Sequence, residues 1–332
     1  MVQRAVIVGA IAASLALGAP AFAKPTRSPP PPAPVQIDFW REVIDPHGVE
    51  IAGLITKATT ALRFADEATQ ADGEWSVADH MRYFVDVYNM MHYARSLAPD
   101  NADVLATFAR AADELGRTRE ARAAWAHYME VADEHLNADA LGRYGSLLLR
   151  SGERDAAITV LRNAQGPLRA NNAVAQFLLA NALAARGEIT AALDVIQAAL
   201  PSQIQYYSAD VTLLTFAQAV ILDQDEQRSA AFETLDRERN AMSTTYATSV
   251  LNALATVRFA PPEDQHYYLG LLYESQHQYV EARASFTLYA AVPDALWRRR
   301  ALEHVHAIDA ERKAPKPVPE KKPPPPVIVP MP

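Results

Sequence analysis

The chain has 332 residues, 50% of them hydrophobic, and its 31 basic and 39 acidic residues give a formal net charge of −8 at pH 7. This length and apolar content are enough for a sizeable core. The absence of cysteine excludes disulfides, thiolate nucleophiles, zinc–thiolate sites and a lipid-modified N-terminal cysteine. The acidic balance argues against broad nucleic-acid binding, which needs cationic side chains over the phosphates.

Residues 1–23 have the pattern of a secretory signal peptide. Arg4 precedes an apolar stretch, and Ala21-Phe22-Ala23 fits the small-residue cleavage pattern. We therefore expect export to the periplasm or cell envelope, cleavage after Ala23, and no transmembrane span in the mature chain. The alternative is an uncleaved N-terminal anchor.

Proline-rich segments flank the body of the chain. Residues 24–35 hold six of the 23 prolines, and residues 313–332 hold nine. Such composition favours extended, disordered polyproline segments over helices or sheets. The second segment is also rich in lysine, so it is a candidate for contact with anionic polymers of the envelope. Its lysines are Lys313, Lys316, Lys321 and Lys322.

The body is rich in alanine and poor in glycine, which indicates an all-helical fold. Residues 36–101 contain two long helical stretches that end before Pro99, and we expect an N-terminal cap or atypical repeat there. Residues 102–201 then carry three similar units, at 102–135, 138–170 and 173–201. Their turn glycines, Gly116, Gly152 and Gly187, are 36 and 35 residues apart. Each unit repeats small and large side chains at matching positions: Ala109, Ala121 and Trp125; Gly145 and Ala157; Ala180 and Ala192.

A fourth unit spans residues 263–293, after an irregular helical stretch at 202–262 that contains a degenerate repeat. Gly270, Tyr273, Ala282 and Phe286 resemble the tetratricopeptide pattern of small and aromatic residues. The resemblance implies a right-handed α-solenoid of stacked helix–turn–helix repeats, with small residues where two helices cross. Residues 294–312 suit a C-terminal cap helix. A generic alanine-rich bundle is the alternative.

No catalytic motif is present, and we expect neither an enzyme nor a cofactor. His127, Glu130 and Glu134 share one helix face and could hold a metal, but a solvated face is the favoured interpretation, so no metal is expected. His304 and His306 are predicted to be exposed cap residues. The same is predicted for the basic cluster from Trp297 to Arg300.

The resemblance also implies a function. First helices of stacked repeats line a concave groove, so we expect a non-catalytic scaffold of the periplasm or envelope that binds a peptide or domain of a protein partner. The groove candidates are Arg110, Ser146, Arg150, Phe177, Asn181, Tyr267, Leu271 and Glu274.

Two alternative functions stay open. One is an envelope glycan-binding module or peptidoglycan-acting enzyme, in which the pairs Tyr206-Tyr207 and Tyr267-Tyr268 stack on sugars. The other is an accessory factor of pilus or surface-motility assembly, which follows from family analogy alone.

Overall fold

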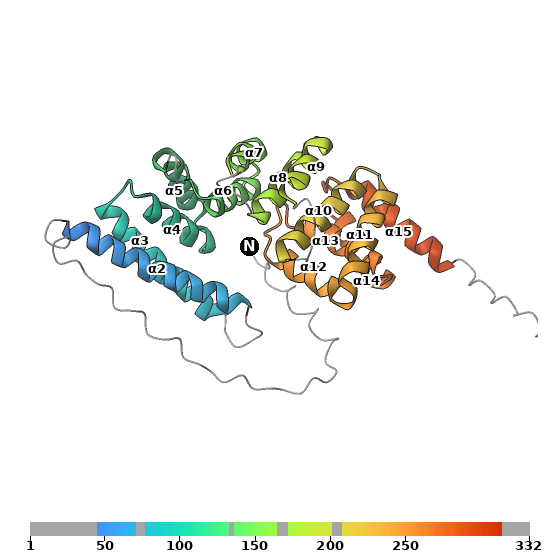
Figure 1. Ribbon diagram of the computed structural model, residues 1–332, viewed down its shortest axis with the longest axis horizontal. Coiled ribbons are helices and arrows are strands. Elements are labelled where there is room, and N and C mark those ends of the chain that lie inside the picture. Colours follow the sequence, from blue (N-terminus) through green and yellow to red (C-terminus); the bar gives the residue numbers. More distant parts are fainter. Residues whose placement is uncertain (1–44, 71–76, 133–135, 165–171, 201–207, 314–332) are drawn as a thin grey trace, which may run out of the picture. The chain divides into compact units, whose positions relative to one another are not determined.

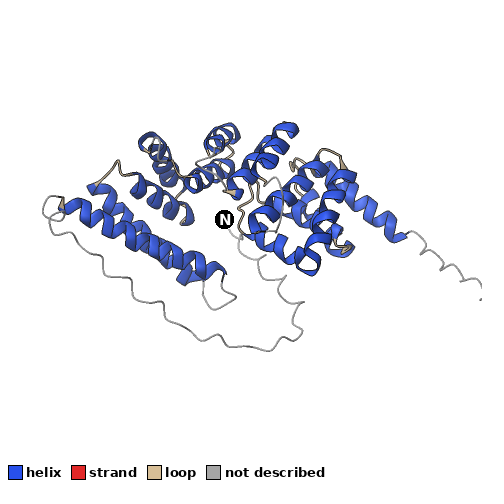
Figure 2. Ribbon diagram, in the orientation of Figure 1, coloured by secondary structure: helices blue, strands red, loops and turns tan. Residues whose placement is uncertain are grey.

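In the computed structural model, every regular element of the described residues is a helix (Figures 1 and 2). Apart from residues 45 and 46, these residues belong to one compact unit, His47–Pro332. The predicted signal peptide and the segment 24–35 lie outside the described residues, as do residues 314–332, Glu134, Tyr206 and Tyr207. The structure describes residues 45–70, 77–132, 136–164, 172–200 and 208–313.

Two long helices, α2 (Pro46–Gln70) and α3 (Val77–Leu97), occupy the region predicted to be a cap. Phe64 of α2 stacks on Tyr83 of α3, with ring centroids 6.4 Å apart. Helix α3 also packs against α4, the first helix of the first repeat. The two long helices therefore cover one end of the repeat core.

Three helix pairs follow, each joined by a turn of three residues, and the two helices of each pair pack against each other. In Figure 1 the second helices, α5, α7 and α9, lie together on one side of the first helices, α4, α6 and α8. The bounds of the pairs are α4 (Ala102–Glu114) with α5 (Thr118–Val131), α6 (Ala138–Arg150) with α7 (Arg154–Asn163), and α8 (Ala173–Ala185) with α9 (Ile189–Ala199).

The irregular region contains a fourth full pair and one extra helix. Helix α10 packs on α8, on its own partner α11 and on the extra helix α12. A segment at 256–263 then leads to the last pair, and a final helix packs against that pair. The bounds are α10 (Ala209–Gln224), α11 (Arg228–Met242), a short 3-10 turn (Ser243–Thr245), α12 (Tyr246–Ala255), α13 (Asp264–Ser275), α14 (Tyr279–Ala290) and α15 (Arg298–Lys313).

Five turns share one backbone geometry, which identifies the degenerate unit as a genuine repeat. In each turn one residue has a positive φ, and the next N–H donates to the carbonyl five residues earlier, which closes the helix end. Glycine fills the first three positions, but Glu226 (φ 63°) and His277 (φ 58°) fill the last two. The closing donors are Arg117, Glu153, Glu188, Gln227 and Gln278.

Close helix crossings explain two buried glycines of the predicted repeat core. A Cβ added at Gly145 would lie 2.5 Å from the side chain of Leu161, and one added at Gly270 would lie 2.8 Å from Phe286. Real Cβ atoms do not approach other atoms so closely, so the second helix of each pair can pack only against glycine there. Ala109, Ala121, Ala157, Ala180, Ala192 and Ala282 are fully buried at the other crossings, Trp125 and Phe286 are buried beside them, and Tyr273 is half-buried.

The chain is an all-helical solenoid of helix–turn–helix repeats. The N-termini of the first helices are also alike. In the first four pairs an Asn or Ser side chain caps the N-terminus of the first helix. The capping residues are Asn101, Asn137, Asn172 and Ser208.

Exchanging residues at two of these turns should change stability in opposite directions. Glu226→Gly should raise the free energy of unfolding by about 0.5–1 kcal/mol, because glycine removes the left-handed strain and only an exposed ion pair to Arg299 is lost. Gly152→Ala, at φ 80°, should lower it by about 1–2 kcal/mol. Urea unfolding measures both, and a change of the same sign in the two variants would contradict the shared geometry.

Candidate partner-binding groove

The first helices of three successive repeats enclose a cavity of about 260 Å³, which we call the inner cavity. Helix α6 contributes Ser146 and Arg143, α8 contributes Val174, and Asp113 comes from the end of α4. The cavity is open to solvent and carries both charged and apolar groups. Such a surface suits a polypeptide, which offers both kinds of group.

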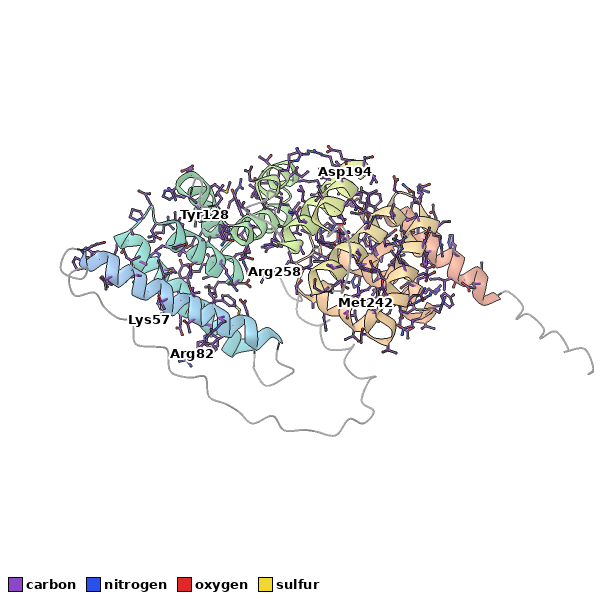
Figure 3. All side chains as sticks on the ribbon, in the orientation of Figure 1. Lys57, Arg82, Tyr128, Asp194, Met242 and Arg258 are labelled. Carbon is purple, nitrogen blue, oxygen red and sulfur yellow. The ribbon has the colours of Figure 1, made fainter. Side chains whose placement is uncertain are left out.

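A segment of the chain itself crosses this face. Residues 256–261 leave α12 and pass the inner side of α8, and Figure 3 shows Arg258 on the side of α6 and α8 away from α7 and α9. The Arg258 guanidinium pairs with Glu114 and lies 3.8 Å from Asp113, more than 140 residues earlier in the chain. This segment therefore holds the irregular region against the first repeat.

Asp113 is the acidic centre of this contact. Its side chain is 10% exposed, and Arg150 donates to its Oδ2 over 2.7 Å. Its other oxygen, Oδ1, is buried and accepts no hydrogen bond within the described residues. Buried acceptors normally find a donor, so this oxygen is an unsatisfied acceptor on a residue that lines the inner cavity.

The next residue of the crossing segment, Phe259, packs in an aromatic cluster. Its ring lies 5.8 Å from that of Phe177 and 5.1 Å from that of Tyr268. The Tyr268 hydroxyl donates to Asn181 Oδ1, while Asn181 Nδ2 donates to the Phe177 carbonyl over 2.9 Å. These side chains line a second cavity of about 160 Å³, the aromatic cavity, on the other side of the segment.

Five of the eight predicted groove residues lie at or near this inner face. Ser146 lines the inner cavity, and Phe177 and Asn181 line the aromatic cavity, although the Phe177 side chain is only 1% exposed. Arg150 pairs with Asp113, and Arg110 pairs with Asp66 of α2, so both arginines are engaged within the chain. Their contact with a partner stays a prediction.

The remaining three, Tyr267, Leu271 and Glu274, are buried, with 0%, 0% and 3% of their surface exposed. The expectation that they face a groove is wrong in this structure. Their helix, α13, contacts α11 as well as its own partner α14, and its polar residues bond to α10 and α15. The side of α13 that would line the groove in a regular repeat is therefore covered by other helices of the chain.

A charged cluster fills that covered side. His304 of α15 is fully buried between two carboxylates: Nδ1 lies 2.6 Å from Glu274 Oε2, and Nε2 lies 2.8 Å from Asp223 Oδ2. Arg300 and the Tyr267 hydroxyl each donate to Asp223 over 2.6 Å, and Arg228 pairs with Glu274. The cluster joins α10, α11, α13 and α15.

The cluster sets its own protonation states. Burial alone would raise the pKa of Asp223, but hydrogen bonds from His304, Arg300 and Tyr267 lower it to about 2. Burial alone would lower the pKa of His304, but its hydrogen bonds to Asp223 and Glu274 outweigh this effect and raise the pKa. Both ring nitrogens then act as donors, and the imidazolium links the two carboxylates.

This arrangement corrects the sequence-based expectation for α15. His306 is exposed as predicted, but His304 is not a surface residue. Arg300 also departs from its expected exposed position, because its side chain is 11% exposed and pairs with the buried Asp223. A fully buried imidazole cannot meet a substrate in this conformation, so the cluster acts as an internal brace.

Of the three residues considered as metal ligands, His127 and Glu130 lie in the described part of the chain. His127 Nε2 lies 2.9 Å from Asp100 Oδ1, and Glu134 lies outside the described residues. In the described part of the chain, no group of three His, Asp or Glu side chains is arranged to hold a metal ion. The same residues include no helix that is both long and apolar enough to cross a membrane.

Comparisons with known proteins do not identify a family for this chain. No family model and no curated protein sequence matches the chain. Among solved structures it is similar to the crystal structure of the APC/C hetero-tetramer Cut9-Hcn1, with 13% identity over 81% of this chain and a TM-score of 0.43. It is also similar to the TPR domain of P58(IPK), with 13% identity over 82% of this chain, 69% of that chain and a TM-score of 0.29.

The chain spans about half the length of the first of these structures, since the match covers 50% of it. With such low identity and scores, the repeat architecture rests on the turns, caps and crossings described above.

Proposed function

We propose that this protein is a non-catalytic interaction scaffold of the periplasm or cell envelope, which binds an extended segment of a protein partner on the inner face of α4, α6 and α8. The observation that carries the proposal is the inner cavity, with the buried Oδ1 of Asp113 beside it and lacking a donor. Stacked repeats characteristically use such faces for binding. The signal-peptide pattern of residues 1–23 supports the envelope location.

Burial of the Tyr267-Tyr268 pair argues against the glycan-binding alternative. Tyr267 and Tyr268 are 0% and 1% exposed, so neither ring offers a face on which a sugar could stack. The other pair, Tyr206 and Tyr207, lies outside the described residues. Contact between the tail lysines and anionic polymers stays a prediction that depends on residues 314–332.

Blocking the inner cavity should abolish partner binding. Val174→Arg places a long cation on the cavity wall, whereas Thr159→Arg places the same side chain on the exposed surface of α7. The full-length protein and both variants would be used to capture proteins from native envelope fractions. We expect wild type and Thr159→Arg to retain one common partner, and Val174→Arg to lose it by about tenfold or more.

Matching melting temperatures would show that Val174→Arg still folds. If a folded Val174→Arg retained the same partner at the same level as wild type, the inner cavity would not be the binding site.

A further inference from the structure

The aromatic cavity has features that the proposed scaffold role does not by itself require. It lies between α8, the end of α10, the start of α13 and the loop that precedes α15. Phe177, Phe259 and Tyr268 pack together on one wall, and the half-buried Trp297 comes from the loop. Phe177 and Tyr268 are each 1% exposed, so the rings that can present a face to a ligand are those of the half-buried Phe259 and Trp297. Such rings attract a cation near their faces.

The polar groups that remain unsatisfied there are acceptors. Gln224 is 7% exposed, lines the cavity, and its Oε1 accepts no hydrogen bond within the described residues. By contrast, the Asn181 side chain is satisfied, since its amide donates to Phe177 and its oxygen accepts from Tyr268. The buried polar atom left unsatisfied at this cavity is therefore an acceptor.

A carboxylate lines the same cavity as Gln224. Asp264, in the first turn of α13, lines the cavity and forms no ion pair with an Arg, Lys or His of the described residues. Burial raises the pKa of Asp264 to about 7, although a hydrogen bond from Tyr289 and the charge of Arg154 act in the opposite direction. Arg154 and Asp294 also line the cavity and are exposed, and Arg154 forms no ion pair with Asp264.

From this geometry we propose that the aromatic cavity binds the ammonium group of a lysine side chain from the partner protein. The ammonium has three donors and no acceptor, which suits Gln224 Oε1 and the Asp264 carboxylate, and its charge suits the aromatic wall. A carboxylate or phosphate would meet Asp264 as a like charge. The inference rests on the proposed scaffold function and names the chemistry that its partner must supply.

The test is an NMR titration of the full-length protein at neutral pH with n-butylammonium as the probe. We expect saturable binding at millimolar concentration, with no binding of acetate and weaker binding of n-butylguanidinium. Asp264→Asn and Gln224→Leu should each weaken n-butylammonium binding by about tenfold, since each removes a hydrogen bond to a charged group. The matched control Asp210→Asn, an exposed acid of α10 outside this cavity, should bind as wild type does.

Equal binding by folded Asp264→Asn and Gln224→Leu variants, or stronger binding of n-butylguanidinium or acetate, would overturn the inference. Thermal melting of each variant checks that it folds. The titration involves no partner protein, and Val174→Arg lies outside the aromatic cavity. Failure of the ammonium site and failure of the scaffold function are therefore observed separately.

Discussion

Replacing His304 by leucine should lower the free energy of unfolding by about 3–5 kcal/mol, the usual cost of removing one partner from a buried ionic cluster. The substitution deletes the imidazolium between Asp223 and Glu274, which are 0% and 3% exposed. Each carboxylate keeps an arginine partner, Arg300 or Arg228, but loses a hydrogen bond of 2.6–2.8 Å. Urea unfolding near pH 6 measures the effect.

His306→Leu is the matched control, because His306 lies on the same helix and is exposed. It should change the free energy of unfolding by less than about 0.5 kcal/mol. If the two leucine variants had the same stability, the cluster would not act as a brace between the helices.

The second large effect concerns Glu238 of α11, which is 2% exposed and forms no ion pair with the described residues. Burial raises its pKa from 4.5 to about 7. Between those values the unfolded chain loses the proton while the folded chain keeps it, so stability falls as pH rises. The part of this loss that is due to Glu238 should be about 3 kcal/mol between pH 4 and pH 8.

Glu238→Gln removes this titration. The variant should match wild type near pH 4 and exceed its stability by about 3 kcal/mol at pH 8, as measured by urea unfolding across that range. Glu233→Gln, at an exposed position of the same helix, is the control and should show no such divergence. A difference between Glu238→Gln and wild type that stayed constant with pH would contradict the burial of an ionisable Glu238.

His304 contributes a pH dependence of the same sign. Because its pKa is raised on folding, its stabilising contribution is complete below the unfolded value of about 6.5. The contribution is lost as pH rises through the folded pKa. Asp223 acts at the other end of the scale, where its contribution is lost as pH falls below about 4 toward its folded pKa of about 2.

The repeat architecture could be predicted from the sequence because small residues and turn residues recur at a fixed spacing. Gly145 and Gly270 mark crossings where a Cβ would collide with the facing helix, so the sequence records the packing directly. The repeat at α10 and α11 was harder to recognise, since Glu226 replaces the turn glycine. Its backbone adopts the same turn because neighbouring contacts hold it there.

The buried charged cluster could not be predicted from local spacing. Asp223, Glu274 and His304 come from three helices, and each looks like a surface residue on its own helix. His306 is near His304 in the sequence, but the partners of His304 lie 30 and 81 residues away. The same packing of α15 and α11 explains why Tyr267, Leu271 and Glu274 are buried rather than exposed in a groove.

The contacts of the crossing segment, residues 256–261, could not be predicted from the local sequence either. Nothing in the local sequence pairs Arg258 with Glu114, because the contact depends on how far the stacked repeats curve. Phe259 gave a weak signal, as an aromatic residue in a loop next to two prolines.

The central claim, that a partner segment lies on the inner face of α4, α6 and α8, is tested most directly by site-specific photocrosslinking in the native cell. A photoreactive phenylalanine would replace Arg143 or Val174 in the inner cavity, or Thr159 on the outer surface. We expect that both inner positions crosslink to one continuous segment of the same protein and that the outer position does not. Crosslinks to that protein from Thr159 alone, or none from either inner position, would contradict it.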